Sequence, residues 1–519
     1  MKKVIKNHLF LFSLFPFFLG IFTSFSLPPY NFILINFITF PMLLFIVFKL
    51  KESKKKIYSF FKVGWIFGFG YFLSNLYWIT YSLTFYEDFK IFIPIALILI
   101  PAFLGIFYGL IIALLFKLDF KKKITAILIF SLIFSIIEFL RGNILSGFPW
   151  NLIAFSWSFS TSFLQILSFI GTYSFNLISI TIFTLPFVFI FKNYKKIQLG
   201  IFFTLLFIIG TNYIYGFKVI NNKNKSNLNY SSQKIKIISP KISIDKFINN
   251  PDEKSILIDL IKLSNPKKNI PTIFIWPEGA LTGIYFNELS KYSDLFSSNF
   301  SNNHLIIMGI NTQNSIKNTG QIYNSMIAVD NNLQLLAKYN KNKLVPFGEF
   351  LPFEKLFKKA GLKKLSYGYE SFSSGKERKI ISINNKIINI NFLPLICYEI
   401  IYSGSINPND KSYNLIINLS EDGWFGNSVG PFQHFTHSVF RAIEEGKNII
   451  RSANNGISAY VDRNGEIINK LESTERGVIE VNNFTNSKKT LFSRVGNKMF
   501  FYFILFYIIL IFFINKKET

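Results

Sequence analysis

Long apolar runs, separated by short polar stretches, fill the first 215 residues of the chain. About twenty apolar residues, wound as a helix, cross the hydrocarbon core of a bilayer. Runs of that size lie at 9–26, 32–48, 60–82, 91–116, 124–140, 168–191, 197–215 and 498–514. Residues 217–497 contain none. The pattern predicts eight transmembrane helices, seven before a large insert and one after it.

The insert has a different pattern, in which short β-branched runs alternate with stretches of helical periodicity. The strand-like runs include Ile235–Ile238, Thr272–Trp276, Leu305–Ile310 and Leu415–Asn418. Helices are expected around 253–263 and 431–446, and tight turns at Asn331-Asn332 and Asn464-Gly465. This alternation predicts an α/β domain.

The two patterns together divide the chain into three regions. We expect a membrane bundle of seven helices at 1–216, an α/β domain at 217–497, and an eighth helix with a tail at 498–519. Residues 221–234, rich in Asn, Lys and Ser, are interpreted as a solvated tether between bundle and domain.

Composition supports a membrane protein. Half of the residues are hydrophobic, 64 are Phe and only 16% are charged, and the mean hydropathy is +0.34. These values exclude a disordered, collagen-like or disulfide-rich secreted chain. The single cysteine, Cys397, cannot form an intrachain disulfide. The net charge of +27 does not indicate nucleic-acid binding, because many of the lysines flank apolar runs and no nucleic-acid motif is found.

The basic residues predict the orientation of the bundle, since cytoplasmic loops are enriched in Lys and Arg. Every second loop is basic: lysines cluster at 2–6, 49–56, 117–123, 192–196 and 516–517. Both termini are therefore expected in the cytoplasm and the insert on the opposite side. The first run is too long for a signal peptide, and we interpret it as a retained helix.

Three segments of the insert carry candidate chemistry, because each places a reactive side chain just after an apolar run. Glu278 ends the first, Ile273–Gly279; Lys341 lies in the second, Tyr339–Glu349; and Cys397 lies in the third, Leu393–Glu399. Singly, each has an ordinary structural explanation. Together they supply a carboxylate that can deprotonate a thiol and an ammonium that can stabilise an oxyanion. The set predicts acyl transfer through a cysteine thioester.

These segments resemble the Glu-Lys-Cys triad of the nitrilase superfamily. They read Trp-Pro-Glu-Gly, Tyr-x-Lys-x-x-Leu-Val-Pro-Phe-Gly-Glu and Cys-Tyr-Glu, in that order. Leu344–Glu349 is similar to the form found in the apolipoprotein N-acyltransferase family. Further similar stretches are 138–141, 147–151, 418–426, 430–434, 441–444 and 451–456. The resemblance covers nearly the whole chain and is densest over 272–465.

The resemblance implies an eight-helix membrane bundle joined to a nitrilase-like α-β-β-α sandwich. It makes Cys397 the nucleophile, Glu278 the general base and Lys341 the oxyanion-stabilising cation. Lys343 competes for the last role, but the motif places the lysine two residues after the tyrosine, so Lys341 is chosen. The supporting residues that it implies are Glu349, Glu399, Tyr398 and Trp424.

It also implies a function. A membrane phospholipid would donate an acyl chain to Cys397, and the N-terminal diacylglyceryl-cysteine of an apolipoprotein would accept it, the last step of lipoprotein maturation. No cofactor is expected. The implied location is the bacterial inner membrane, with the catalytic domain in the periplasm, and the expected state is a monomer.

Two alternatives remain open at this point. A membrane-tethered nitrilase-type amidase would use water in place of the amine and act on a soluble amide. A transporter would use the bundle as its active part, but such proteins concentrate ionisable residues at mid-membrane. Here Lys62 and Glu138 lie near the ends of their runs, which disfavours transport.

Several further features have a plainer interpretation. His434 and His437 are three residues apart, but no third His or Cys follows nearby, so no metal site is predicted. Arg441 and Glu444 are expected to form a helix pair. Glu138 and Arg141 are either a mutual ion pair or a contact for lipid headgroups.

Two segments concern the surroundings of the site. Lys246-Phe247 stands where the family has Lys-Trp, so Phe247 keeps an apolar contact but loses the indole donor. Residues 350–365 combine helical apolar spacing with five lysines at other positions. They predict an amphipathic arm at the lipid interface or a helix packed on its own domain.

Overall fold

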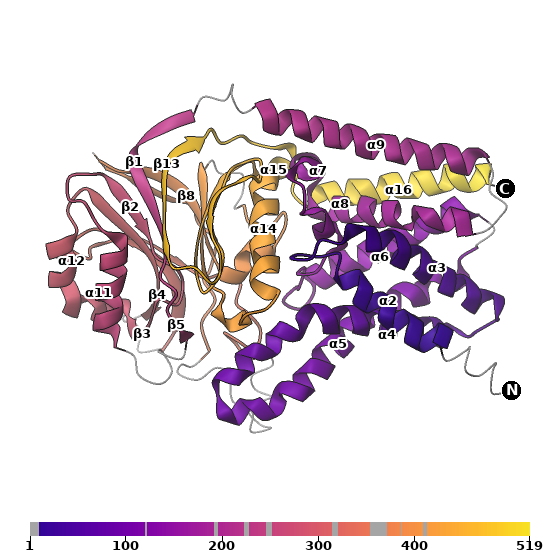
Figure 1. Cartoon of the computed structure of the whole chain (residues 1–519), viewed down its shortest axis with the longest axis horizontal. Coiled ribbons are helices and arrows are strands. Elements are labelled where there is room, and N and C mark those ends of the chain that lie inside the picture. Colours follow the sequence, from indigo (N-terminus) through magenta and orange to yellow (C-terminus); the bar gives the residue numbers. More distant parts are fainter. Residues whose placement is uncertain are drawn as a thin grey trace. The chain divides into compact units, whose positions relative to one another are not determined.

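The computed structural model describes residues 10–119, 122–190, 196–222, 228–244, 252–313, 320–352, 371–385, 387–407 and 413–518. The chain forms two compact units: Met1–Asn221 together with Val495–Thr519, and Asn222–Arg494 (Figure 1). The first unit is helical and the second contains all of the β-strands found in the described residues.

A helix covers each of the eight predicted apolar runs. In chain order these are η1–α2 (Phe10–Ser24), η2–α3 (Ile33–Glu52), α4 (Ile57–Leu76), α5 (Ile93–Leu114), α6 (Lys123–Asn143), α8 (Leu167–Thr184), α9 (Lys196–Asn221) and α16 (Lys498–Lys517). The shorter elements between them are η3 (Tyr77–Phe85), η4 (Glu87–Phe92), η5 (Leu115–Lys117), η6 (Ile153–Trp157), α7 (Thr161–Leu164) and η7 (Leu185–Ile190).

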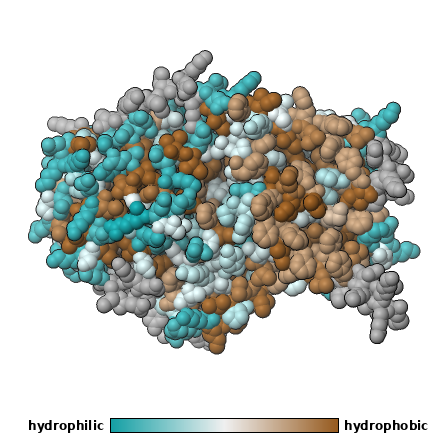
Figure 2. Space-filling model, viewed as in Figure 1, coloured by the Kyte–Doolittle hydropathy of each residue, from teal (hydrophilic) through white to brown (hydrophobic). Residues whose placement is uncertain are grey.

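Six helical segments in the described residues are long and apolar enough to cross a membrane. They are Ile33–Glu52, Glu87–Lys117, Lys123–Asn143, Leu167–Ile190, Gln198–Asn221 and Lys498–Lys517. The N-terminal segment Phe10–Ser24 is shorter, and α4 is not among the six. Eight crossings therefore remain a prediction. The face of the helical unit seen in Figure 2 is mostly apolar, as expected for side chains in contact with lipid.

Glycines bring α4 and α5 close together. A Cβ built on Gly68 would lie 3.0 Å from the Cα of Gly105, and one on Gly105 would lie 3.1 Å from the carbonyl oxygen of Trp65. In lipid, such small residues let helix backbones approach closely. The three glycines of α4, at 64, 68 and 70, are thus used for packing.

The second unit contains two β-sheets. In the described residues, one has the order β13-β1-β2-β4-β5-β6, with β3 also paired to β4, and the other has the order β12-β11-β10-β9-β8-β7. The strands of the first sheet are β1 (Leu228–Ser239), β2 (Thr272–Ile275), β3 (Leu281–Tyr285), β4 (His304–Gln313), β5 (Ile322–Val329), β6 (Leu335–Asn340) and β13 (Gly477–Thr485). Those of the second are β7 (Ile381–Asn384), β8 (Asn389–Ile396), β9 (Leu415–Glu421), β10 (Asn448–Asn454), β11 (Ser458–Val461) and β12 (Ile467–Leu471).

Helices cover the outer faces of this pair of sheets (Figure 1). Helices α11 (Glu253–Ser264) and α12 (Ser293–Asn299) lie against the first sheet, where Leu257, Leu260 and Phe296 join its buried apolar core. Helix α14 (Gly430–Glu445) packs on β10 and β11 of the second. Strand β1 contacts β10 and β11, so the sheets face each other. The layers follow the order α-β-β-α.

In the described residues, the second unit also contains the short helices η9 (Phe286–Tyr292), η10 (Cys397–Ile401), η11 (Gly423–Phe425) and α15 (Leu491–Val495). Both predicted turns are confirmed, since Asn331-Asn332 lies between antiparallel β5 and β6, and Asn464-Gly465 between antiparallel β11 and β12. The interpretation of 221–234 as a tether is wrong for its second half. Residues from Leu228 onward belong to β1 and pair with β13, a partner that the local sequence could not reveal.

Candidate active site

Lys341 lies between two carboxylates. It follows β6, its side chain is 1% exposed, and its Nζ is 2.9 Å from Oε1 of Glu349 and 3.4 Å from Oε1 of Glu278. Burial lowers the pKa of Lys341, but the charges of Glu278 and then Glu349 outweigh it, so the pKa lies well above its usual value. Lys341 is therefore a fixed ammonium. Lys343 is exposed, with its Nζ 5.8 Å from the ring centroid of Tyr402.

Glu278 follows β2 and is buried. Its Oε1 accepts a hydrogen bond from Asn324 Nδ2 at 2.7 Å, and its Oε2 accepts one from the backbone N–H of Glu421 at 3.0 Å. Burial raises the pKa of Glu278, with Lys341 lowering it and Glu349 raising it further. Because the net effect is upward, this carboxylate is a stronger base than a solvated one.

Cys397 begins η10, immediately after β8. Its φ is +47°, in the left-handed region that non-glycine residues seldom adopt. The residue is 8% exposed. Burial and the charge of Glu278 raise the pKa of the thiol, while Lys341 lowers it to a smaller extent. The resting sulfur is thus a thiol, and it requires a base at the moment of attack.

Of the four supporting residues, the two acids contact the lysine and its loop. Glu349 accepts one hydrogen bond from Asn324 Nδ2, at 2.8 Å, and another from the backbone N–H of Val345 in its own loop. Glu399 accepts from the backbone N–H of Asn342 at 2.9 Å and from the N–H of Ile396 at 2.9 Å. Glu399 thereby links the lysine loop to the residue before Cys397.

The two aromatic supporting residues are less closely involved. The ring of Tyr398 is buried and lies edge-on to Tyr402, with 5.5 Å between centroids. Trp424 is partly exposed in the short turn η11. Their roles stay predictions.

The structure also brings in Asn324, which sequence reasoning missed. Asn324 lies on β5 and donates to both Glu278 and Glu349. The sequence does contain an indication of this role, because Asn324 and Ser325 form a polar pair inside the otherwise apolar strand β5. A buried side-chain amide needs hydrogen-bond partners.

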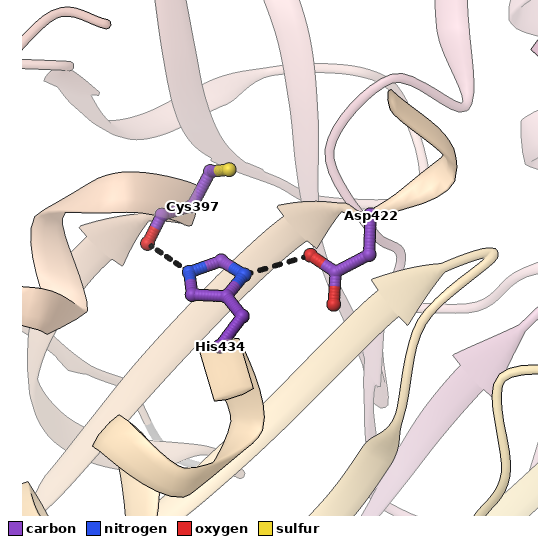
Figure 3. A group of neighbouring side chains, drawn as sticks. All are labelled: Cys397, Asp422 and His434. Atoms are coloured by element: carbon purple, nitrogen blue, oxygen red, sulfur yellow. Dashed lines mark hydrogen bonds and ion pairs between the residues drawn. The ribbon is translucent and has the colours of Figure 1, made fainter. Parts of the chain in front are cut away.

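A second buried group lies beneath Cys397 (Figure 3). His434 Nδ1 is 2.9 Å from Asp422 Oδ1, and its Nε2 is 3.3 Å from the carbonyl oxygen of Cys397. Arg451 Nη2 donates to Asp422 Oδ2 at 2.8 Å. Burial raises the pKa of Asp422, but Arg451 and His434 outweigh it and lower the pKa overall. Burial and Arg451 lower the pKa of His434.

Folding brings a possible third metal ligand close to His434, which the spacing along the sequence did not indicate. The sequence places no Cys near the two histidines, yet ligand atoms of Cys397, Asp422 and His434 lie within 4.8 Å of one another. The guanidinium of Arg451, however, is 3.0 Å from His434 Nδ1 as well, and it would repel a metal cation. The donor set therefore fits a hydrogen-bonded support for the Cys397 backbone better than a metal centre.

The predicted ion pairs are both buried. Arg441 and Glu444 are 2.7 Å apart on α14, with fully buried side chains. In the bundle, Arg141 Nη2 is 2.7 Å from Glu138 Oε2, and Arg141 also donates to the carbonyl oxygen of Phe148. Both members are buried, so the ion-pair interpretation replaces the lipid-headgroup one. The predictions for Lys246-Phe247 and for 353–365 lie outside the described residues.

Comparison with known families agrees with this architecture. Residues 252–482 match the family model described as carbon-nitrogen hydrolase, and residues 19–185 match the apolipoprotein N-acyltransferase N-terminal domain. The solved structures that are similar include an amidase of the nitrilase superfamily from Nesterenkonia, with 13% sequence identity and a TM-score of 0.35. The match covers 50% of this chain and 92% of the amidase chain. The two family matches, together with the apolar helices of the described residues, support a nitrilase-like α/β domain joined to a helical membrane unit.

Curated relatives define the family. An apolipoprotein N-acyltransferase of Rickettsia typhi is 33% identical over 93% of this chain and 94% of its own length. One of Rhizobium etli is 30% identical over 89% of this chain and 88% of its own length. The chain belongs to the apolipoprotein N-acyltransferase family, and it is an acyltransferase. Hydrolysis of a soluble amide is not favoured.

Proposed function

We propose that this enzyme transfers an acyl chain from a membrane phospholipid to the N-terminal amine of a diacylglyceryl apolipoprotein. The observation that carries the proposal is the buried ammonium of Lys341, held between Glu278 and Glu349. Its charge, like that of Glu278, acts on the thiol of Cys397. A nucleophile, a base and a fixed cation are the three groups that acyl transfer through a thioester needs.

In the first half-reaction, Glu278 takes the proton of the Cys397 thiol as the sulfur attacks an ester carbonyl of the phospholipid. Lys341 stabilises the oxyanion of the tetrahedral intermediate. The C–O bond then breaks, and Glu278 returns the proton to the departing lysophospholipid. The raised pKa of Glu278 makes its carboxylate a stronger base for this transfer, whereas the raised pKa of the thiol opposes its deprotonation until the sulfur attacks.

In the second half-reaction, the α-amine of the diacylglyceryl-cysteine attacks the thioester. Glu278 accepts the proton that the amine loses and passes it to the sulfur as the C–S bond breaks, which restores the Cys397 thiol and the Glu278 carboxylate. The thioester holds the acyl group between the two halves, so the scheme needs no cofactor.

The apolar helices explain why such a domain is tied to a membrane. Each methylene of a lipid that leaves the bilayer costs roughly 0.8 kcal/mol, so a thiol at the membrane surface avoids desorption of the donor and of the acceptor. We propose a monomer in the bacterial inner membrane from the family resemblance, and eight crossings from the apolar runs. The lysine pattern of the loops supports cytoplasmic termini and a periplasmic catalytic domain.

We assign the supporting residues by their contacts. Glu349 orients Lys341, and Glu399 fixes the lysine loop relative to the turn of Cys397. For Tyr398 and Trp424, the supporting role is the one that the family resemblance implies.

Intact-protein mass spectrometry tests the proposal directly. Purified enzyme incubated with phospholipid alone should gain the mass of one acyl chain, released by hydroxylamine, and lose it on adding a diacylglyceryl peptide. Cys397→Ala should gain none, and the exposed-site variant Lys343→Met should behave as the wild type. Full transfer by Cys397→Ala would end the proposal. In cells, loss of the protein should leave lipoprotein N-termini without the N-linked acyl chain.

A further inference from the structure

A single carboxylate, that of Glu399, collects hydrogen bonds from both sides of the site. It is fully buried. Besides the N–H groups of Asn342 and Ile396, its donors are the hydroxyl of Tyr339 at 2.7 Å and the N–H of Lys343 at 3.1 Å. The oxygens of an ionised carboxylate can accept all of these bonds, whereas a protonated one would present a hydrogen to a donor.

A buried carboxylate of this kind needs a counter-charge. Lys341 is engaged by two other carboxylates, Glu278 and Glu349. The counter-charge is Arg378, whose Nη2 is 3.3 Å from Glu399 Oε1 and whose Nη1 donates to the carbonyl oxygen of Ser405 at 2.7 Å. The Arg378 side chain is 9% exposed. It comes from the segment at 371–380, between β6 and β7, which has no regular secondary structure.

We infer that Arg378 is a positioning residue for acyl transfer, acting through Glu399. By holding the Glu399 carboxylate in place as its counter-charge, it fixes both the loop that carries Lys341 and the backbone next to Cys397. Neither the nitrilase-like motif nor the comparisons assign a role to this arginine. The inference rests on the proposed acyl transfer at Cys397 and adds a residue to it.

Among the groups around Glu399 in the described residues, Arg378 is the one that carries a positive charge, since the neighbouring tyrosines are neutral. Tyr339 lies on one side, with a pKa that burial and then Glu399 raise, so it is a neutral donor. Burial raises the pKa of Tyr402 to about 12, which keeps that phenol neutral too. Burial lowers the pKa of Arg378, but Glu399 outweighs it and raises the pKa. The guanidinium therefore stays charged at every pH at which the enzyme could work.

Two measurements on the full-length enzyme test how replacing Arg378 changes the reactivity of Cys397. The first is the rate of acyl-enzyme formation from phospholipid. The second is the rate of alkylation of Cys397 by iodoacetamide, which requires no lipid and is specific because the chain has one cysteine. Failure of wild-type enzyme to form an acyl-enzyme would refute the proposed function, while the alkylation rate would still test Arg378.

The variants form a double-mutant cycle of Arg378→Gln and Glu399→Gln. We expect Arg378→Gln to slow both rates by tenfold or more and Arg378→Lys to recover most of the loss. In the Glu399→Gln background, Arg378→Gln should cost less than twofold further, because its partner charge is already gone. The matched control is Arg476→Gln, which removes an exposed arginine from its pair with Asp259 and should change neither rate.

The opposite outcomes overturn the inference. Wild-type rates in Arg378→Gln would overturn it. So would an equal loss of rate from Arg378→Gln in the wild-type and Glu399→Gln proteins, because an arginine with a merely structural role would act independently of Glu399. If Arg378→Gln does not fold, the double variant, which leaves no unpaired buried charge, should regain the folded state. A double variant that also fails to fold would refute the link to Glu399.

Discussion

Two buried groups of charged side chains, one in each unit, are built in different ways. In the helical unit, Glu138 and Arg141 form a one-to-one pair, closed by the carbonyl of Phe148. In the catalytic unit, the single ammonium of Lys341 serves two carboxylates, Glu278 and Glu349. A balanced pair has no reason to change its charge, whereas an unbalanced cluster in low dielectric holds a base that readily takes a proton.

This difference separates a structural ion pair from reactive chemistry better than burial does. Both groups are almost fully buried, and both join residues of opposite charge. Only the catalytic cluster adds a thiol whose pKa depends on its charges. We therefore expect substitutions in the Lys341 cluster to lower the reaction rate, and substitutions in the Glu138–Arg141 pair to lower the free energy of unfolding.

The largest expected effect is on rate, in Lys341→Met. Removing the ammonium leaves the oxyanion without its cation, and losing such a group costs roughly a hundred- to a thousandfold in rate. Acyl-enzyme formation in a single turnover, followed by mass spectrometry, measures it. The control is Lys343→Met, two residues away and exposed. A Lys341→Met rate within threefold of wild type would abolish the contrast between the two units.

The next effect is on stability, in Arg141→Leu. This change leaves Glu138 buried without its cation, which costs about 3–5 kcal/mol, while replacing both residues by apolar ones should restore most of the loss. Thermal unfolding in detergent, followed by circular dichroism, measures both. The exposed pair Lys49–Glu52 provides the control, as Lys49→Leu should change stability by less than about 1 kcal/mol. The folded fraction of Arg141→Leu should keep the wild-type rate of Cys397 alkylation; a slower rate would tie this pair to catalysis.

A third effect concerns pH. Burial raises the pKa of Glu421 from its ordinary value of 4.5 to about 8, against hydrogen bonds from Asn454, Gly423 and Asn455 that lower it. Between these values the folded state holds a proton that the unfolded state has lost, so stability falls as pH rises, by at most about 1.4 kcal/mol per pH unit. Glu421→Gln should remove this slope from unfolding midpoints measured between about pH 5 and pH 8. An unchanged slope would show that other groups cause it.

The smallest effect is at the end of the chain. Helix α6 has no acidic residue in its first turn, and Glu518 supplies one by accepting from the N–H groups of Ile124 at 3.1 Å and Thr125 at 2.9 Å. Carboxylates at helix N-termini contribute about 0.5–2 kcal/mol. Glu518→Ala should lower the unfolding midpoint of the helical unit slightly, without changing the catalytic rate. The exposed Glu52→Ala is the control, and equal shifts in the two variants would argue against capping.

Local patterns predicted much of this architecture. The apolar runs predicted a helix at each of eight places, and β-branched runs predicted β2, β4 and β9 within a few residues, together with the second half of β1. Such signals are local because hydrophobic periodicity acts over one element. They were weaker where an element depends on a distant partner, as in the first half of β1, which pairs with β13.

For the site, the sequence alone determined the order of the three proposed reactive residues, because a thiol, a carboxylate and an ammonium have a characteristic chemistry that follows from the residue type. Only the tertiary structure decided which groups surround them. Asn324 lies 46 residues from Glu278, and Arg378 lies 21 from Glu399. Those distances along the chain carry no pattern, since hydrogen bonds and charges act through space, and the packing of two sheets sets which side chains meet.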